Sequence, residues 1–286
     1  MDRKTNTKDS VLIIAAEASS IAYAARLIQY WKRQGCDLDL FGIGSQEMET
    51  LGFRRLGRAE DMAVVGFSEI LEHYSEIKRV FYAIIEEAKK CRPKIVILMD
   101  YPGFNLKLAR VMSELGIPVV YYIAPQIWAW KQNRVHVIKK YCTKTFLIFP
   151  FEVPFYEKHG VSIEFVGNPL LEDLNPSLKE KAYQDLQRQK YGIQNSDLVL
   201  GIMPGSRKIE IKNHLKTQLE TAQRLQKSIK NLKVVILVAP TVKKEQIQEV
   251  LDSVHLSTLI VQDKPFEMIA LTDFVLVASG TATLMV

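Results

Sequence analysis

Cysteine is scarce in this chain, and its pattern excludes the usual metal-binding arrangements. Three cysteines occur among 286 residues, at Cys36, Cys91 and Cys142, far apart and without a C-x-x-C pair. Such usage argues for a reducing compartment and against a zinc site. The five histidines show neither H-E-x-x-H nor another metal-binding spacing. We therefore expect no metal and no cofactor.

Long apolar runs and basic blocks are also missing. No stretch approaches the ~20 apolar residues that span a bilayer, and the run 11–16 is too short for the core of a signal peptide. Lys and Arg outnumber Asp and Glu by 38 to 32, without a cluster of the kind that binds nucleic acid. We expect a cytoplasmic protein without a nucleic-acid partner, attached at most to a membrane surface.

Short β-branched runs alternate with amphipathic helical patterns along the whole chain, which is typical of an α/β protein with parallel sheets. With 48% hydrophobic residues, the chain is long enough for two domains. Residues 167–176 contain two prolines and are typical of a crossing between domains. We predict two Rossmann-like domains, residues 1–168 and 169–286, whose parallel sheets face one cleft.

The predicted strands are 11–15, 38–43, 94–99, 119–123, 145–148 and 163–166 in the first domain, and 198–203, 233–239, 259–261 and 274–277 in the second. The longest predicted helices are 22–33, 74–90, 104–115 and 209–229.

Two turns in the second domain carry small or hydroxylated residues directly after a predicted strand. Pro204-Gly-Ser-Arg207 opens a helix, where free amides attract phosphate oxygens and an arginine suits a diphosphate. Glu210 would hydrogen-bond a sugar or, alternatively, favour the helix N-terminus. An ordinary capped helix start is the alternative for both turns. The candidate phosphate-site residues are Gly205, Ser206, Arg207, Glu210, Ser279, Gly280, Thr281, Ala282 and Thr283.

Neither turn matches G-x-x-x-x-G-K-[ST] or a sound G-x-G-x-x-G. A nucleoside triphosphatase and a dinucleotide-dependent dehydrogenase are therefore both poorly supported.

In the first domain, Asp100 stands at the end of a very apolar strand, where α/β proteins bind ligands. A dry, aromatic-walled pocket would raise its pKa and suit it to remove a hydroxyl proton. The alternative is an aspartate that caps the following helix. Glu17, directly after the first strand, is either a solvent-facing cap or a second carboxylate in the cleft.

Two indoles, Trp128 and Trp130, follow a strand-like run and Pro125, an arrangement that suits a wall for a flat or apolar ligand. Tryptophans are more often core or interface residues, which is the alternative here. Core packing is the default interpretation of the apolar segment 62–71. The functional interpretation is an exposed apolar edge that binds acyl chains or contacts a membrane surface. Its candidate contact residues are Val64, Val65, Phe67, Ile70 and Leu71.

An ordered series of phrases closely resembles the bacterial lipid-A-disaccharide synthases, a family of inverting glycosyltransferases. Ile127-Trp-Ala-Trp130 is the most specific of them, and together they span nearly the whole chain. The others are Ala16-Glu-Ala-Ser19, Phe41-Gly-Ile-Gly44, residues 62–71, 100–105 and 121–134, Phe149-Pro-Phe-Glu152, Gly167-Asn-Pro-Leu-Leu171, Pro204-Gly-Ser-Arg207 with Glu210, and residues 279–284.

The resemblance implies a GT-B fold with an acceptor-side first domain and a nucleotide-sugar-side second domain. It implies that UDP-2,3-diacylglucosamine is joined to 2,3-diacylglucosamine 1-phosphate through a β-1,6 bond, with release of UDP. Asp100 would be the base, Arg207 would hold the diphosphate, and residues 64–71 would meet acyl chains at the cytoplasmic face of the inner membrane. The partners expected are these two substrates, that membrane face and a second copy in a homodimer. Further substrate contacts expected are Glu17, Ser19, Asn105, Gln126, Trp128, Trp130 and Asn168.

The sequence departs from the family pattern at three places. Ser20 and Ile21 stand where the family has Gly-Asp, so we expect a turn built for glycine to be restricted and a carboxylate to be lost. Met285 stands where an acidic ribose contact is usual. The chain ends just where a helix should follow the 279–283 turn, so we expect an incomplete second domain in a truncated copy.

The leading hypothesis is therefore a metal-independent hexosyltransferase of lipid A biosynthesis. The alternatives are a non-catalytic remnant that binds acylated glucosamine, and a GT-B transferase for another UDP-sugar acceptor.

Overall fold

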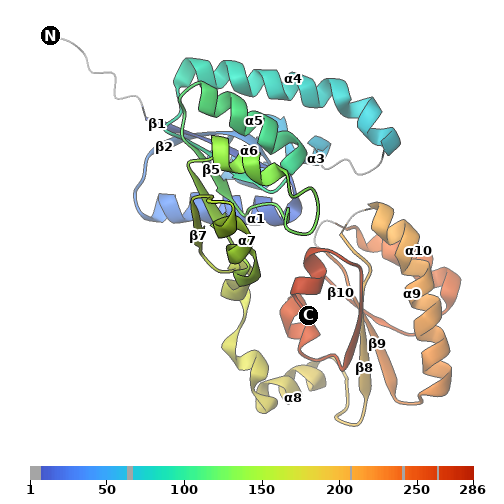
Figure 1. The fold of residues 1–286 in the computed structure, drawn as a ribbon. Coiled ribbons are helices and arrows are strands. Elements are labelled where there is room, and N and C mark those ends of the chain that lie inside the picture. The colour runs from blue at the N-terminus through green and yellow to red at the C-terminus, as the bar shows by residue number, and fades with distance from the viewer. Residues whose placement is uncertain (1–7, 63–66, 207, 240–241, 263) are drawn as a thin grey trace. The chain divides into compact units, whose positions relative to one another are not determined.

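The computed structural model describes residues 8–62, 67–206, 208–239, 242–262 and 264–286. The chain divides into two compact units, residues 1–169 and residues 170–286. Each has its own parallel sheet and its own hydrophobic core (Figure 1).

The first unit is built on a seven-stranded parallel sheet in the order β3-β2-β1-β4-β5-β6-β7. Its strands are β1 (Asp9–Ala15), β2 (Leu38–Gly44), β3 (Arg54–Arg58), β4 (Ile95–Met99), β5 (Val119–Tyr122), β6 (Lys144–Leu147) and β7 (Ile163–Phe165). Its helices are α1 (Ala18–Arg33), α2 (Gln46–Thr50), α3 (Ala59–Met62), α4 (Phe67–Cys91), α5 (Pro102–Glu114), α6 (Arg134–Tyr141), the 3₁₀ turn η1 (Pro150–Glu152) and α7 (Val153–Lys158).

The central strands are apolar because both faces of this sheet are covered by helices. In β1, every residue from Val11 to Ala15 is at most 4% exposed, and β4 is almost as deeply buried. Figure 1 shows α4, α5 and α6 on one side of the sheet and α1 on the other. The sheet therefore follows the doubly wound pattern that the alternating sequence predicts.

The chain changes direction in this sheet between β1 and β4. From β1 it runs outward through β2 to β3, then returns to place β4 on the other side of β1. In open α/β sheets, ligands bind outside the carboxyl ends of the strands at such a switch point. The loops after β1 and β4 are thus the first place to look for a site.

The edge strand β3 is missing from the predicted strands, and charge is the reason. Its sequence, Arg-Arg-Leu-Gly-Arg, lacks the apolar run of the central strands. Charged side chains are common on edge strands, where they prevent pairing with another chain. Here Arg54 reaches Glu87 on α4 at 2.9 Å and stands over the Phe41 ring at 5.2 Å.

The second unit has a four-stranded parallel sheet in the order β10-β9-β8-β11. Its strands are β8 (Leu198–Met203), β9 (Leu232–Leu237), β10 (Leu259–Val261) and β11 (Phe274–Val277). Its helices are α8 (Lys181–Lys190), α9 (Lys208–Ser228), α10 (Lys244–Val254) and α11 (Pro265–Ile269), with 3₁₀ turns η2 (Pro169–Asp173, which crosses from the first unit), η3 (Pro176–Lys179) and η4 (Thr281–Leu284).

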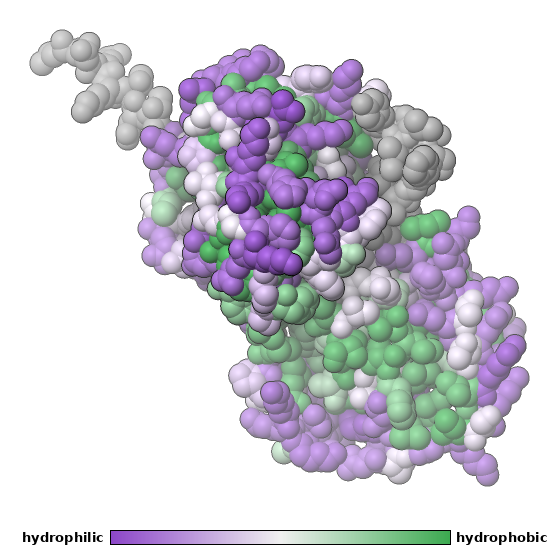
Figure 2. Space-filling model, in the orientation of Figure 1, coloured by the Kyte–Doolittle hydropathy of each residue, from purple (hydrophilic) through white to green (hydrophobic). Residues whose placement is uncertain are grey.

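Burial is less complete in this second sheet. The strands β8 and β9 are buried, whereas β10 and most of β11 are half-buried and Phe274 is 62% exposed. Apolar side chains gather on the visible surface of this unit (Figure 2). No helix in the described parts of the chain is both long and apolar enough to cross a membrane.

Candidate functional site

The carboxyl edge of the first sheet brings together three predicted site segments. The register pairs Ala15 of β1 with Met99 of β4, and Met99 with Tyr122 of β5. Glu17, Asp100 and the segment from residue 123 onward therefore leave the sheet side by side. This is the switch point, so the structure places both candidate carboxylates where the fold favours ligand binding.

The backbone at Asp100 adopts an uncommon conformation. Asp100 and Tyr101 have φ values of +45° and +44°, and Ile123 on the neighbouring strand end has +63°. Non-glycine residues in this left-handed region cost about 1–3 kcal/mol each and persist only where the surroundings hold them. Tyr101, and not Asp100, occupies the N-cap position of α5.

Two buried side chains hold this turn from below. The Tyr121 hydroxyl donates to the Asp100 carbonyl at 2.6 Å, and the Asn105 amide donates to the same oxygen at 2.7 Å and to the Met99 carbonyl at 3.1 Å. Burial, and secondarily the Asp100 carboxylate, raises the pKa of Tyr121 well above its usual range, so the phenol stays a donor. These hydrogen bonds fix the backbone of Asp100, and the backbone in turn sets the direction of its half-buried side chain.

Asn105 was predicted to contact the substrate, but in the structure its side chain is buried beneath the Asp100 turn. Its side chain is 0% exposed, so it offers no surface to a ligand in this conformation. Both of its amide hydrogen bonds go to the turn that carries Asp100. Asn105 therefore supports the candidate base from behind.

Glu17 caps the first turn of α1 next to this loop. The Ser20 hydroxyl accepts from the Glu17 backbone N–H at 3.0 Å and donates to the Glu17 carbonyl at 2.8 Å. Burial, followed by the charge of Glu17, raises the pKa of Tyr101. Ser19 lies half-buried in the same helical turn.

The structure shows how the chain accommodates the departures at Ser20 and Ile21, while the loss of a carboxylate at position 21 stands as predicted. Ser20 is a buried residue inside the first turn of α1, where no glycine is required. Ile21 packs against the hydrophobic core of the unit. Both residues are accommodated as ordinary parts of a helix, because α1 starts at Ala18 and not four residues later as predicted.

The aromatic segment after β5, residues 126–130, has one buried side chain, Ile127, and exposes its two indoles. Ile127 is 1% exposed, whereas Trp128 and Trp130 are 37% and 70% exposed, and Gln126 is exposed as well. The Lys131 ammonium stands 4.2 Å from the Trp130 ring centroid. The core-packing alternative for the two indoles is thus not what the structure shows, and both present faces to solvent.

One buried carboxylate near these indoles escaped the sequence analysis. Glu152, the last residue of η1, is 1% exposed, and neither of its oxygens makes a hydrogen bond of ordinary geometry. Burial raises its pKa to about 7, an effect that the Phe149 backbone and the Trp128 side chain partly oppose. Its signal in the sequence is only its place after two phenylalanines in Phe149-Pro-Phe-Glu152.

The second unit brings its two predicted loops to neighbouring strand ends. Strands β8 and β11 are paired, with Met203 opposite Val277, so the turns 204–206 and 279–283 leave the same edge. Gly205 has φ +114°, and a Cβ atom there would lie 2.4 Å from Glu210 Oε2, so this position requires glycine. Arg207 lies outside the described residues.

Of the two roles expected for Glu210, the structure shows the one at the helix N-terminus. Its carboxylate accepts the Ser206 backbone N–H at 2.9 Å across the first turn of α9. An acceptor at a helix N-terminus is stabilising. In this conformation, the Ser206 amide that the sequence assigned to a phosphate already has an acidic acceptor.

The second loop is a short 3₁₀ turn. Gly280 has φ +147° at its start, and the Thr283 hydroxyl donates to the Gly280 carbonyl at 2.6 Å. Ser279, Gly280 and Thr283 are exposed, Ala282 is half-buried, and Thr281 lies in the same turn. Met285 packs against the core of the unit, so its apolar side chain has a structural use.

The remaining candidates lie elsewhere in the first unit. Asn168 is half-buried next to Pro169, whose carbonyl accepts from Arg26 of α1 at 3.2 Å. Val64 and Val65 lie outside the described residues. Phe67, Ile70 and Leu71 belong to the start of α4, but only their backbone is described.

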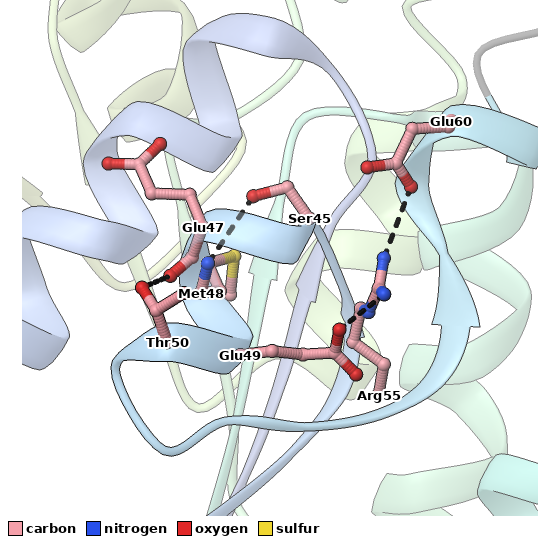
Figure 3. A network of polar contacts seen from close by, with 7 residues as sticks. All are labelled: Ser45, Glu47, Met48, Glu49, Thr50, Arg55 and Glu60. Atoms are coloured by element: carbon pink, nitrogen blue, oxygen red, sulfur yellow. Dashed lines mark hydrogen bonds and ion pairs between the residues drawn. The ribbon is translucent and has the colours of Figure 1, made fainter.

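An ionic network fixes the elements that lead into that apolar segment (Figure 3). Arg55 of β3 pairs with Glu49 of α2 and, at 3.4 Å, with Glu60 of α3. The Arg55 side chain is 11% exposed, whereas its partners Glu49 and Glu60 are 41% and 55% exposed, so the pairs lie at the surface. The network ties β3 to α2 and α3. Within the described residues, no cluster of three or more His, Cys, Asp or Glu could hold a metal ion.

Two units, each built on a parallel sheet, define a GT-B-like fold. Solved structures with the same fold include a UDP-GlcNAc 2-epimerase from Neisseria meningitidis bound to UDP-GlcNAc, with a TM-score of 0.60 and 14% identity, covering 95% of this chain and 78% of that one. A putative UDP-N-acetylglucosamine 2-epimerase from Listeria monocytogenes gives 0.61 and 12%, covering 96% and 75%. At such low identity the likeness concerns the fold alone.

Sequence comparisons decide the family. Residues 11–286 match the family model described as lipid-A-disaccharide synthetase. The lipid-A-disaccharide synthase of Trichlorobacter lovleyi is 37% identical over 274 residues, 96% of this chain and 70% of that protein. That of Geobacter sulfurreducens is 35% identical over 279 residues, 98% and 72%. The chain belongs to the lipid-A-disaccharide synthase family, the glycosyltransferases of lipid A biosynthesis.

Proposed function

We propose that this chain joins UDP-2,3-diacylglucosamine to 2,3-diacylglucosamine 1-phosphate through a β-1,6 bond, giving lipid A disaccharide 1-phosphate and UDP. The observation that carries the proposal is the position of Asp100. It stands at the switch point of the first sheet, on a strained turn held by Tyr121 and Asn105, in a chain of this family.

In the proposed reaction, Asp100 takes the proton of the acceptor 6-hydroxyl as that oxygen attacks the anomeric carbon of the donor sugar. The bond from that carbon to the UDP oxygen breaks on the opposite face, and UDP leaves with the electron pair. Configuration at the anomeric carbon inverts, since attack and departure occur on opposite faces. A positioned general base of this kind contributes roughly 10²–10⁴-fold to the rate.

We assign donor binding to the second unit. The amides of Gly205 and Ser206 at the start of α9, the Arg207 guanidinium and the 279–283 turn would stabilise the charge on the departing diphosphate. A metal ion is then not needed for that purpose. The Ser206 amide now donates to the Glu210 carboxylate, so this hydrogen bond must break before the amide can bind the diphosphate. In this proposal Glu210 holds the conformation of the loop.

We assign acceptor binding to the first unit. Glu17 and Ser19 lie beside the Asp100 turn, and Gln126, Trp128 and Trp130 offer an exposed, amphipathic wall after β5. Residues 64–71 would take acyl chains at the cytoplasmic face of the inner membrane, with the protein bound peripherally there. We also propose that two copies of this chain form a homodimer.

The test is disaccharide 1-phosphate formation by the purified 286-residue chain, with both acylated substrates in detergent. Asp100→Asn should lower the rate by roughly 10²–10⁴-fold while the unfolding transition is retained. Asp37→Asn is the matched control, because Asp37 is exposed in a surface pair with Lys8. Full activity of Asp100→Asn would remove Asp100 from the mechanism.

Two other outcomes would replace the proposal. Saturable binding of the acylated sugar phosphate, without UDP release from a folded wild-type chain, would make this a binding protein. Faster turnover of a soluble, non-acylated acceptor would make it a GT-B transferase with a different substrate.

A further inference from the structure

Tyr101, the residue that follows the candidate base, is the more strained half of the left-handed turn. Asp100 and Tyr101 have φ values of +45° and +44°. Aspartate is enriched in this region of backbone space, whereas a bulky residue there is an outlier. The hydrogen bonds from Tyr121 and Asn105 end on the Met99 and Asp100 carbonyls, so they do not explain how the Tyr101 side chain is held.

The Tyr101 ring belongs to a column of three aromatic side chains, Tyr101, Phe104 and Phe81. It stacks on Phe104 of α5, with 5.7 Å between the ring centroids and 25° between the ring planes. Phe81 of α4 meets the Phe104 ring edge-on, at 5.3 Å and 86°. Favourable aromatic pairs are offset-stacked or edge-to-face with centroids about 4.5–7 Å apart, and both pairs satisfy this. The column therefore links the Asp100 turn to α4 by favourable contacts.

The column is anchored in the hydrophobic core of the first unit. Phe104 is 5% exposed and belongs to the core cluster, while Phe81 and Tyr101 are half-buried and pack against the same cluster. The backbone adds to this, since the Phe104 and Asn105 amides both donate to the Tyr101 carbonyl, at 3.2 and 3.0 Å. Tyr101 is thus fixed at its ring and at its carbonyl, directly after Asp100.

We propose that Tyr101 is a positioning residue for Asp100, and that the stack with Phe104 and Phe81 holds it in its strained conformation. Strained backbone persists only where the surroundings fix it, and the column is the contact that fixes the side chain here. Without the stack, Tyr101 relaxes to an ordinary conformation and the peptide plane that it shares with Asp100 turns. This inference rests on the proposed function, because that function makes Asp100 the base.

The kinetic test uses the transfer assay with the purified chain. Phe104→Leu and Tyr101→Asn should each lower kcat about 10-fold, with KM for the acceptor nearly unchanged, because a displaced base loses rate and not binding. Asparagine tolerates the left-handed backbone but has no ring to stack, so Tyr101→Asn tests the ring itself. Tyr101→Phe keeps the ring and should keep the wild-type kcat. Leu108→Val is the control, since Leu108 is 0% exposed one turn further along α5 and belongs to neither ring pair.

A second test does not depend on turnover and uses the ligand-free chain. Native-state hydrogen exchange, followed by NMR, reports the opening of single amides. The Asn105 amide, which donates to the Tyr101 carbonyl, should exchange about 10-fold faster in Phe104→Leu than in the wild type. The amides of β1 should accelerate much less. In Leu108→Val the Asn105 amide should accelerate no more than those of β1.

The two tests fail in different ways. A folded Phe104→Leu or Tyr101→Asn with the wild-type kcat would overturn the proposal. Equal acceleration of exchange at Asn105 and in β1 would also overturn it, because Phe104 would then be only a packing residue. Full activity of Asp100→Asn would instead refute the proposed function, and with it any role of Tyr101 in positioning a base, whatever the exchange rates show.

Discussion

The two units carry their candidate sites on the same kind of sheet edge but support them differently. In the first unit, the Asp100 turn rests on Tyr121 and Asn105, both 0% exposed, and the aromatic segment rests on Tyr156. In the second unit, the 204–206 and 279–283 turns are exposed at Ser206, Ser279, Gly280 and Thr283, and their described support is local, from Glu210 and from Thr283 within the turn.

The difference follows from what each site is proposed to do. A general base must be held within a fraction of an ångström of the proton it removes, and buried hydrogen bonds supply that precision. A diphosphate is bound by several amides and a cation at once, so a loop that adjusts to it is sufficient. Substitutions should therefore act on stability and rate together in the first unit, and on ligand affinity in the second.

The largest effect that tests this contrast is expected for Asn105→Ala. It removes the hydrogen bonds that Asn105 donates to the Met99 and Asp100 carbonyls and leaves a cavity in the core. Tyr121 still donates to the Asp100 carbonyl, so the cost, about 1–3 kcal/mol for a lost buried partner, comes from the Met99 side and adds to that of the cavity. We expect the free energy of unfolding to fall by about 4 kcal/mol and the rate by about 100-fold, because Asp100 loses its orientation. Urea denaturation and the transfer assay measure the two losses. Asn231→Ala, an exposed amide in the second unit, should change neither by much; equal losses in the two variants would refute the contrast.

Glu152→Gln should give the next largest effect, and its sign depends on pH. The carboxyl pKa is about 7 in the folded protein against a reference value of 4.5, so the folded state keeps its proton longer than the unfolded one. Stability then falls as pH rises from about 4.5 to 7, by up to about 3 kcal/mol. Glu152→Gln should match the wild type at pH 4 and exceed it by up to that amount at pH 8. Denaturant titrations at both pH values would show this, and equal stability at pH 8 would contradict the buried charge.

Gly205→Ala should have a moderate effect confined to the second unit. The new Cβ would require left-handed backbone and meet Glu210, which together cost about 2 kcal/mol. We expect a higher KM for the UDP-sugar, measured with the acceptor at saturation. Gly192→Ala is the matched control, since it has φ +68° but open space around the Cβ position. If both variants lose the same stability, the contact with Glu210 contributes nothing.

The smallest effect is expected for Glu210→Gln. An amide oxygen can still accept the Ser206 N–H, so unfolding should change by less than about 0.5 kcal/mol. Removing one negative charge next to the proposed diphosphate site should tighten UDP binding by about 2–5-fold. Calorimetric titration with UDP measures it, with Glu245→Gln at the start of α10 as the control. Weaker binding would mean that Glu210 contacts the nucleotide directly.

Periodicity and apolar runs predicted the parallel sheets because the central strands are buried on both faces. The strands at 198–203, 259–261 and 274–277 agree with β8, β10 and β11 to the residue. The edge strand β3 was not predictable in this way, because its three arginines remove the apolar signal. The start of α1 was placed late, since its first turn is small and polar and carries no helical pattern.

The candidate site was predictable as a set of segments but not as a set of roles. Strand-end position and residue type indicated Asp100, Glu17 and the two turns of the second unit. Sequence could not show that Asn105 points inward or that Glu152 is buried, because an Asn in a helix and a Glu after an aromatic run are ordinarily exposed. Such roles depend on contacts between residues far apart in the chain.

The order of strands in the first sheet has a consequence for synthesis of the protein. The central strand β1 leaves the ribosome first, yet its partner β4 begins only at Ile95, 80 residues after Ala15. At about 5–20 residues per second, β1 waits about 4–16 s with one apolar edge unpaired. During that interval Leu12, Ile13 and Ile14, which lie at the centre of the finished sheet, can pair with another chain.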